Sequence, residues 1–267
     1  HLSEYASSKT LSSELNYWLH SKRKEVNPLP IDKEKAINNR ENSTVKKMSL
    51  GRNETRLLID SPSKDKSISV QSILVAGLAL TLSRWSKTSN VLIDLEGHGR
   101  EESIGSSINL TRTVGWFTSC YPALLQVEDS KDMSKTLHHV AQELTDIPNK
   151  GIGYGILRYL SNQADIKSKF ESLPQAEVAF NYTGIGSRSD KTNHEEKQRK
   201  ESSGSLGQIA LLQSKQRRRT HRFEIVAGIS KGILTVRWGY SLDDYQEETV
   251  SQLCEEYLQA VVGMTIK

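Results

Sequence analysis

The chain has 267 residues, of which 36% are hydrophobic, with a mean hydropathy of −0.54 and a formal net charge of +4. This length allows one large domain or two small ones, and no apolar run approaches the roughly 20 residues that span a bilayer, so we expect no membrane segment. Cys120 and Cys254 form neither a disulfide framework nor a zinc pattern, which favours a cytoplasmic protein. The first residues contain no initiator Met and no signal peptide, so we expect a chain excised from a longer protein.

A basic cluster lies in the last third of the chain, and it raises the question of nucleic-acid binding. No aromatic platform or DNA-binding motif accompanies it, so we interpret it as a solvated basic loop and expect no nucleic-acid partner. Its members are Lys215, Arg217, Arg218, Arg219 and Arg222.

The first elements alternate between helical periodicity and breaks. Residues 11–20 carry one apolar stripe at helical spacing, formed by Leu11, Leu15, Trp18 and Leu19. Two prolines within residues 27–32 end that helix, and the polar stretch to about Thr44 is typical of a linker. Residues 69–86 predict a buried helix, and Val91–Leu95 predicts a short buried strand that ends at Glu96.

The second half of the chain predicts further strands and helices without strict alternation. A strand is expected over 124–127, a helix over 131–145 and a strand over 177–182. The polar composition from Ser187 to about Ser205 predicts a mobile loop. Residues 223–229 and 233–240 alternate as in a β-hairpin, and a helix follows from about Tyr245 to Val262, with Asp244 and Glu247 as a capping pair. This order predicts an α/β layered fold with a mixed sheet.

Glu96 is the first residue with a chemical role to consider, because it follows a strand and has Gly97 and Gly99 beside it. Small neighbours let a substrate approach the backbone, and burial would raise the pKa of the carboxyl toward the range of a general base or acid. The alternative is a carboxylate that ends the strand and pairs with Arg100 or Arg112.

Four other sites are considered for a chemical role. His98 either orients a neighbour or packs, and we favour packing. His138 and His139 are expected to be ordinary residues of a helix. Tyr182 can offer a hydroxyl from a strand end to stabilise an oxyanion, although a core tyrosine is the alternative. Residues 148–155 contain three glycines but lack the ending of a phosphate-binding loop, so nucleotide binding is not expected.

Four strings in one order resemble the motif series of the epimerization domains of nonribosomal peptide synthetases. They are Glu-Gly-His-Gly-Arg-Glu at 96–101, Arg-Thr-Val-Gly-Trp-Phe-Thr at 112–118, Gly-Ile-Gly-Tyr-Gly at 151–155 and Phe-Asn-Tyr-Thr-Gly at 180–184. Peptide-bond-forming condensation domains share the fold but usually read Gly-x-Phe-Val-Asn-Thr where this chain has Gly115-Trp-Phe-Thr118. Two departures are Thr183, where the family usually has Leu, and the absence of a His-His-x-x-x-Asp-Gly motif.

The resemblance implies an isomerase that inverts the Cα of an aminoacyl or peptidyl thioester. The substrate would arrive on the phosphopantetheine arm of a peptidyl carrier protein, with no metal or cofactor of the domain's own. By resemblance, Glu96 and Tyr182 are catalytic. The supporting residues would be His98, Arg100, Trp116 and Asn181.

The resemblance also implies a division of the chain. Residues 1–267 would form the C-terminal lobe of an epimerization domain with a chloramphenicol-acetyltransferase-like architecture, whose missing N-terminal lobe bears the His-His-x-x-x-Asp-Gly motif. Within it we expect an entry helix and linker at 1–44, a core at 45–186, a mobile crossover at 187–220, and a hairpin and helix at 221–267. The isolated chain should be almost inactive. The alternatives are a condensation domain and a non-catalytic lobe that docks a carrier protein.

Overall fold

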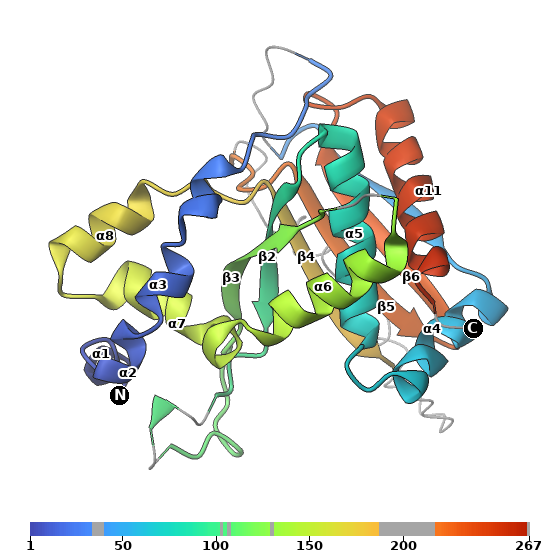
Figure 1. Ribbon diagram of the computed structural model, residues 1–267. Coiled ribbons are helices and arrows are strands. Elements are labelled where there is room, and N and C mark those ends of the chain that lie inside the picture. The colour runs from blue at the N-terminus through green and yellow to red at the C-terminus, as the bar shows by residue number, and fades with distance from the viewer. Residues whose placement is uncertain (34–39, 102–103, 106–107, 129–130, 187–216, 266–267) are drawn as a thin grey trace.

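The computed structural model describes residues 1–33, 40–101, 104–105, 108–128, 131–186 and 217–265. A six-stranded sheet forms its centre, with helices packed against it (Figure 1). The strands are β1 (Ser43–Ser49), β2 (Asn90–Gly97), β3 (Ser119–Gln126), β4 (Val178–Ile185), β5 (Phe223–Ser230) and β6 (Ile233–Ser241).

Long helices pack on the sheet, and short helical turns gather beside its β3 edge (Figure 1). The long helices are α4 (Arg52–Lys64), α5 (Val70–Ser86), α6 (Met133–Thr145) and α11 (Glu247–Gly263). The short ones are α1 (Leu2–Tyr5), α2 (Lys9–Ser12), α3 (Leu15–Trp18), η1 (Ser21–Glu25), η3 (Pro148–Gly151), α7 (Ile152–Gly155), η4 (Ile156–Leu160) and α8 (Ala164–Glu171).

The sheet is mixed, which confirms the predicted α/β class. Its strand order is β1-β6-β5-β4-β2-β3, in which β4 runs parallel to both β2 and β5 and the other pairs are antiparallel. The parallel pairs bring the ends of β2 and β4 to the same edge of the sheet, although more than 80 residues separate them in the chain. This topology positions the candidate site.

Helix α5 is the centre of the core, as its apolar sequence predicts. Ser69 caps it by accepting a hydrogen bond of 2.9 Å from the Ser72 amide. Gly77 allows α11 to approach closely, because a Cβ there would lie 2.9 Å from Cγ2 of Val261. Burial of α5 between the sheet and its neighbouring helices therefore depends on the small residue at this crossing.

The predicted hairpin is also confirmed. Strands β5 and β6 pair in antiparallel register around Lys231 and Gly232, whose φ angles are +51° and +71°. Two consecutive left-handed residues form the turn that fits the right-handed twist of a two-residue hairpin.

The two faces of β2 differ in chemistry because side chains alternate along a strand. Ile93 and Leu95 are buried in the core below the helices, and Phe180 of β4 lies beside Leu95 on that face. Asp94 and Glu96 therefore point to the opposite face.

The N-terminal segment differs from the prediction of one helix over 11–20. It forms α2 and α3, which are separated at Glu14, and the Glu14 carboxylate accepts a hydrogen bond of 2.8 Å from the Trp18 indole. Tertiary contacts of the apolar side chains, rather than one continuous helix, explain the apolar spacing. Similarly, β1 begins at Ser43, inside the stretch predicted as linker.

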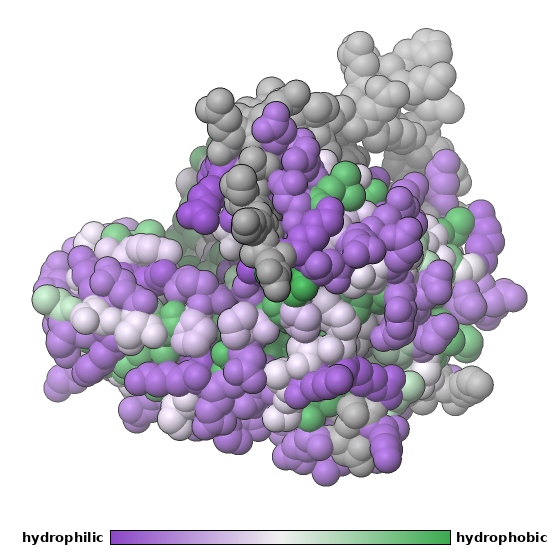
Figure 2. Space-filling model, turned by 90° about the horizontal axis from the view of Figure 1, so that it is seen from above, coloured by the Kyte–Doolittle hydropathy of each residue, from purple (hydrophilic) through white to green (hydrophobic). Residues whose placement is uncertain are grey.

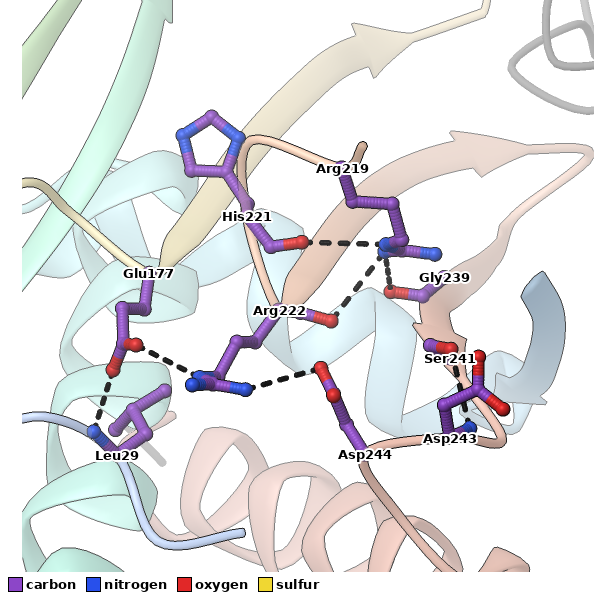
Figure 3. A network of polar contacts seen from close by, with 9 residues as sticks. All are labelled: Leu29, Glu177, Arg219, His221, Arg222, Gly239, Ser241, Asp243 and Asp244. Atoms are coloured by element: carbon purple, nitrogen blue, oxygen red, sulfur yellow. Dashed lines mark hydrogen bonds and ion pairs between the residues drawn. The ribbon is translucent and has the colours of Figure 1, made fainter. Parts of the chain in front are cut away.

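The interpretation of the basic cluster as a solvated loop is wrong for two of its members. The side chain of Arg219 is only 1% exposed and donates to the carbonyl oxygen of Gly239 at 2.8 Å. Arg222 pairs with Glu177 at 2.8 Å and with Asp244 at 3.2 Å (Figure 3). The predicted cap is also wrong: the Asp244 side chain is fully buried and bonded to Arg222, and Gln246 is the residue that precedes α11.

The surface seen in Figure 2 is mostly polar, with hydrophobic residues scattered among hydrophilic ones. In the described part of the chain, no helix has the length and apolar character needed to cross a membrane. The loop predicted from Ser187 to about Ser205 lies outside the described residues, as does Lys215.

Candidate functional site

Glu96 lies near the end of β2, between β3 and β4. Its Cα partner on β3 is Cys120, and its Oε2 accepts a hydrogen bond of 2.5 Å from Nδ2 of Asn181 on β4. Arg100 donates instead to the carbonyl oxygens of Leu110 and Thr113, at 2.9 and 3.1 Å. The structure thus pairs Glu96 with a neutral amide rather than with this arginine.

The environment of Glu96 suits proton transfer. Neighbouring protein atoms displace part of the water around the carboxylate, which raises its pKa above the ordinary value, whereas the charge of His221 lowers it. A carboxyl held in this balance can accept and return a proton closer to neutral pH than a fully solvated one.

A groove of about 580 Å³ borders Glu96 at this edge of the sheet. It lies between the ends of β2 and β4, the segment before α5 and the end of α6. Its chemically useful lining residues are Lys66, Ser69, Glu96, His98, Glu101, Tyr121, Lys150 and Tyr182. The groove therefore combines carboxylates, amines, an imidazole and phenols beside an apolar wall.

Tyr182, near the end of β4, borders the same groove. Val178 and Phe180, which precede it at period two, are buried below the helices, so Tyr182 leaves the helix-covered face of β4 and Asn181 leaves the other. Because Asn181 contacts Glu96, the Glu96 and Tyr182 side chains leave opposite faces of the sheet, and both residues border the groove at the strand ends. Burial raises the pKa of the Tyr182 phenol, which keeps it protonated and able to donate.

A second carboxylate, Glu101, is held firmly in the groove. It accepts from Lys150 Nζ at 3.1 Å and lies 3.3 Å from Nε2 of His98, and its side chain is only 11% exposed. His98 is not packed in the core, since its side chain is 64% exposed. Sequence reasoning assigned no role to Glu101 or Lys150, although each lies within or beside a quoted motif.

Arg100 and Trp116 belong to a neighbouring loop rather than to the groove lining. The Arg100 guanidinium lies 4.3 Å from the ring centroid of Phe117, in addition to its contacts with the carbonyl oxygens of Leu110, Thr113 and Gly115. Trp116 is 84% exposed, and Val114, two residues before it, is 98% exposed. The structure therefore brings Glu96, Asn181, Tyr182 and His98 together and leaves Trp116 apart from them.

A second cavity and the possible metal ligands were considered as alternative sites. A cavity of about 360 Å³ at the start of β2 and β4 contains Glu177, whose carboxylate is engaged by Arg222 and by the Leu29 amide (Figure 3). Among the described residues, no group of three His, Cys, Asp or Glu side chains could hold a metal ion.

Comparisons with known proteins agree on one family. Residues 1–266 match the family model of the condensation domain. The chain is 38% identical to a linear gramicidin synthase protein of Brevibacillus parabrevis over 260 residues, which are 96% of this chain and 3% of that protein. It is 33% identical to bacitracin synthase 3 of Bacillus licheniformis over 266 residues, 98% of this chain and 4% of that protein.

Solved structures give the same fold. The crystal structure of the epimerization domain from the third module of tyrocidine synthetase B has a TM-score of 0.82 and 29% identity, with 99% of this chain and 57% of that chain covered. The first condensation domain of the calcium-dependent antibiotic synthetase has a TM-score of 0.63 and 14% identity, with 99% of this chain and 53% of that chain covered. The chain thus spans little more than half of these two structures and a few per cent of the two synthases.

Proposed function

The chain belongs to the condensation-domain family of nonribosomal peptide synthetases, and from this premise we propose that it is the C-terminal lobe of an epimerization domain. The proposed reaction inverts the Cα configuration of an aminoacyl or peptidyl thioester bound to a peptidyl carrier protein. Domains of this family carry no cofactor of their own, and their substrate arrives on a phosphopantetheine arm.

The observation that carries this proposal is the difference between two structural likenesses. The tyrocidine epimerization domain has a TM-score of 0.82 at 29% identity, whereas the condensation domain of the calcium-dependent antibiotic synthetase has 0.63 at 14%. The epimerization-type strings at 96–101 and 112–118 support the same assignment.

The proposed chemistry needs a base on one face of the substrate and an acid on the other. In the forward direction, a base takes the Cα proton and leaves an enolate-like thioester, and an acid returns a proton to the opposite face, so the atoms balance. We assign one proton transfer to Glu96, whose raised pKa suits it, and we assign support of the developing oxyanion to the protonated Tyr182.

The second proton-transfer group would come from the lobe that bears the His-His-x-x-x-Asp-Gly motif. On this proposal the groove beside Glu96 receives the thioester end of the carrier arm. Asn181 and His98 are supporting residues that hold the carboxylates of Glu96 and Glu101. Arg100 and Trp116 would act on the neighbouring loop.

Deuterium wash-in at the substrate Cα tests the proposal. The full-length protein that holds this chain is incubated in D₂O with a loaded carrier protein, beside a Glu96→Gln variant and a Glu128→Gln control on the exposed surface. We expect exchange with inversion that falls by about 10²- to 10⁴-fold in Glu96→Gln and is unchanged in Glu128→Gln. Absence of exchange in the parent protein would contradict epimerization.

A condensation activity is the second candidate, because the matching family model is that of the condensation domain. Donor and acceptor thioesters on two carrier proteins distinguish the reactions, since only condensation forms a new amide. A lobe that only docks a carrier protein would form no amide and exchange no proton, and carrier binding would survive Glu96→Gln.

A further inference from the structure

Asp94 and His221 form a pair on the same face of the sheet as Glu96. Asp94 precedes Glu96 by two residues on β2, so their side chains leave the same face. Nε2 of His221, from the turn before β5, lies 2.7 Å from Oδ2 of Asp94, and the two side chains are only 15% and 21% exposed. Nδ1 of the same imidazole lies 3.0 Å from the Thr220 hydroxyl.

The turn that carries His221 is held without its imidazole (Figure 3). Arg219 donates to the carbonyl oxygens of His221, Arg222 and Gly239, at 3.3, 3.4 and 2.8 Å. The backbone amide of Arg222 donates to the Glu177 carbonyl at 2.7 Å. These contacts clamp the backbone on both sides of residue 221, so the imidazole is not required to fix the turn.

The imidazole is instead in a position to act on Glu96. Its charge lowers the pKa of Glu96, opposing the rise caused by lost hydration. The imidazole therefore contributes to the electrostatic field at the Glu96 carboxylate.

Other charged and titratable groups also lie around Asp94, Glu96 and His221. Glu96 faces Asp94 on its own strand, Cys120 on β3 and the neutral Asn181 on β4, and its groove side has Lys66, His98, Glu101, Lys150 and Tyr182. Asp94 also interacts electrostatically with Arg23, Arg158, Tyr154 and Cys120. Arg222 with Glu177 lies in the turn beside His221.

We propose that Asp94 and His221 are positioning residues for Glu96: Asp94 holds the imidazole on the face of the sheet from which the Glu96 side chain extends, and the imidazole stabilises the Glu96 carboxylate electrostatically. The role in catalysis rests on the proposed epimerization, whereas the electrostatic coupling does not. His221 would touch neither substrate nor reacting atoms.

NMR titration of the Glu96 carboxyl carbon tests the coupling without any catalytic turnover. The chain is labelled with ¹³C at glutamate side chains, and the Glu96 signal is the one lost in Glu96→Gln. In His221→Asn, whose amide can still donate to Asp94, we expect the midpoint of the Glu96 pH titration to move to higher pH. In His221→Lys, which keeps a positive charge, it should return toward the parent value. His138→Asn is the matched control, because His138 also lies beside an aspartate, at 3.1 Å from Asp65, but is not among the groups that shift the pKa of Glu96.

The catalytic consequence is read from the pH dependence of Cα deuterium exchange in the full-length protein. We expect the acid limb to move to higher pH in His221→Asn and to move back in His221→Lys. A Glu96 midpoint that is the same in His221→Asn and the parent would overturn the proposal, provided that both unfold at similar temperatures. If the parent exchanges no proton, epimerization fails, and the titration still decides the coupling.

Discussion

The Asn181 amide of β4 donates a hydrogen bond of 2.5 Å to the Glu96 carboxylate of β2, across the parallel pair of strands. This contact joins two of the quoted motifs, one at 96–101 and the other at 180–184. A neutral donor orients the carboxylate and favours its ionised form without neutralising it by an ion pair.

Replacing Asn181 by Leu should therefore slow proton transfer. A hydrogen bond to a charged group contributes about 1.5–3 kcal/mol, so we expect Cα exchange to fall by about 10- to 100-fold. Thr183→Val is the control, because Thr183 lies two residues on along β4 and bonds to the Ala227 carbonyl rather than to Glu96. Equal exchange in Asn181→Leu and the parent would show that this amide does not orient the base.

Two glycines of residues 148–155 differ in whether they can be replaced by a residue with a side chain. Gly151 has a φ of +82°, and a Cβ there would lie 2.1 Å from the Tyr121 ring. Gly155 has a right-handed conformation and no atom within 4 Å of such a Cβ. Gly151→Ala should lower the free energy of unfolding by about 2–5 kcal/mol, whereas Gly155→Ala should leave it unchanged or raise it by up to about 1 kcal/mol.

Urea denaturation of the two variants measures this difference. The pair is matched in chemistry, and the two sites lie in one short segment, so expression and handling are the same for both. Similar midpoints would mean that the left-handed turn over Asn149, Lys150 and Gly151 relaxes freely.

The sequence predicted the elements whose pattern is local. Helix α5 has a buried apolar sequence, and the β5–β6 hairpin has alternation on both sides of a Lys-Gly turn. In contrast, no element was predicted over 45–68, where the structure has most of β1 and the whole of α4. Strand β1 is an edge strand whose alternation is between exposed and half-buried residues, so its hydrophobic signal is weak.

The remaining differences come from contacts between distant residues. Whether Asp244 caps α11 or pairs with Arg222 depends on where the turn before β5 lies, which local sequence does not specify. Glu101 and Lys150 meet across 49 residues, and Asp94 and His221 across 127. Motif strings predicted the Glu96 region, while its charged surroundings required the folded chain.

Removing only one partner of the buried Arg222–Asp244 pair should lower the free energy of unfolding. Asp244 is fully buried, burial raises its pKa, and Arg222 opposes that rise. Arg222→Met leaves the carboxylate without its cation, and we expect a loss of about 3 kcal/mol in the free energy of unfolding at neutral pH. The loss should shrink on acidification, because Asp244 then becomes neutral.

A double-mutant cycle with Asp244→Asn isolates this interaction. Since the amide has no charge to leave unpaired, Arg222→Met should cost less in the Asp244→Asn background than in the parent. Equal costs in the two backgrounds would show that Arg222 acts through its contact with Glu177 alone.

Glu143 of α6 should make the stability of the chain depend on pH near neutrality. Burial raises the pKa of its carboxyl to about 7, against the opposing hydrogen bond from the Gln126 amide at 3.1 Å. An unfolded glutamate titrates near 4.3, so the folded state binds the proton more tightly. The stability from this group is complete below about pH 4.3 and is lost as pH rises through about 7.

Glu143→Gln keeps an acceptor for the Gln126 amide and removes the titration. The parent should therefore lose stability relative to the variant as the pH rises. We expect the difference in their free energies of unfolding to change by about 1–3 kcal/mol from pH 5 to pH 8, in favour of the variant, measured by urea denaturation at each pH. His139 lies 3.4 Å from Glu143, so the comparison is repeated in a His139→Gln background. Parallel curves for Glu143→Gln and the parent in both backgrounds would show that Glu143 is ionised in the folded chain throughout this range.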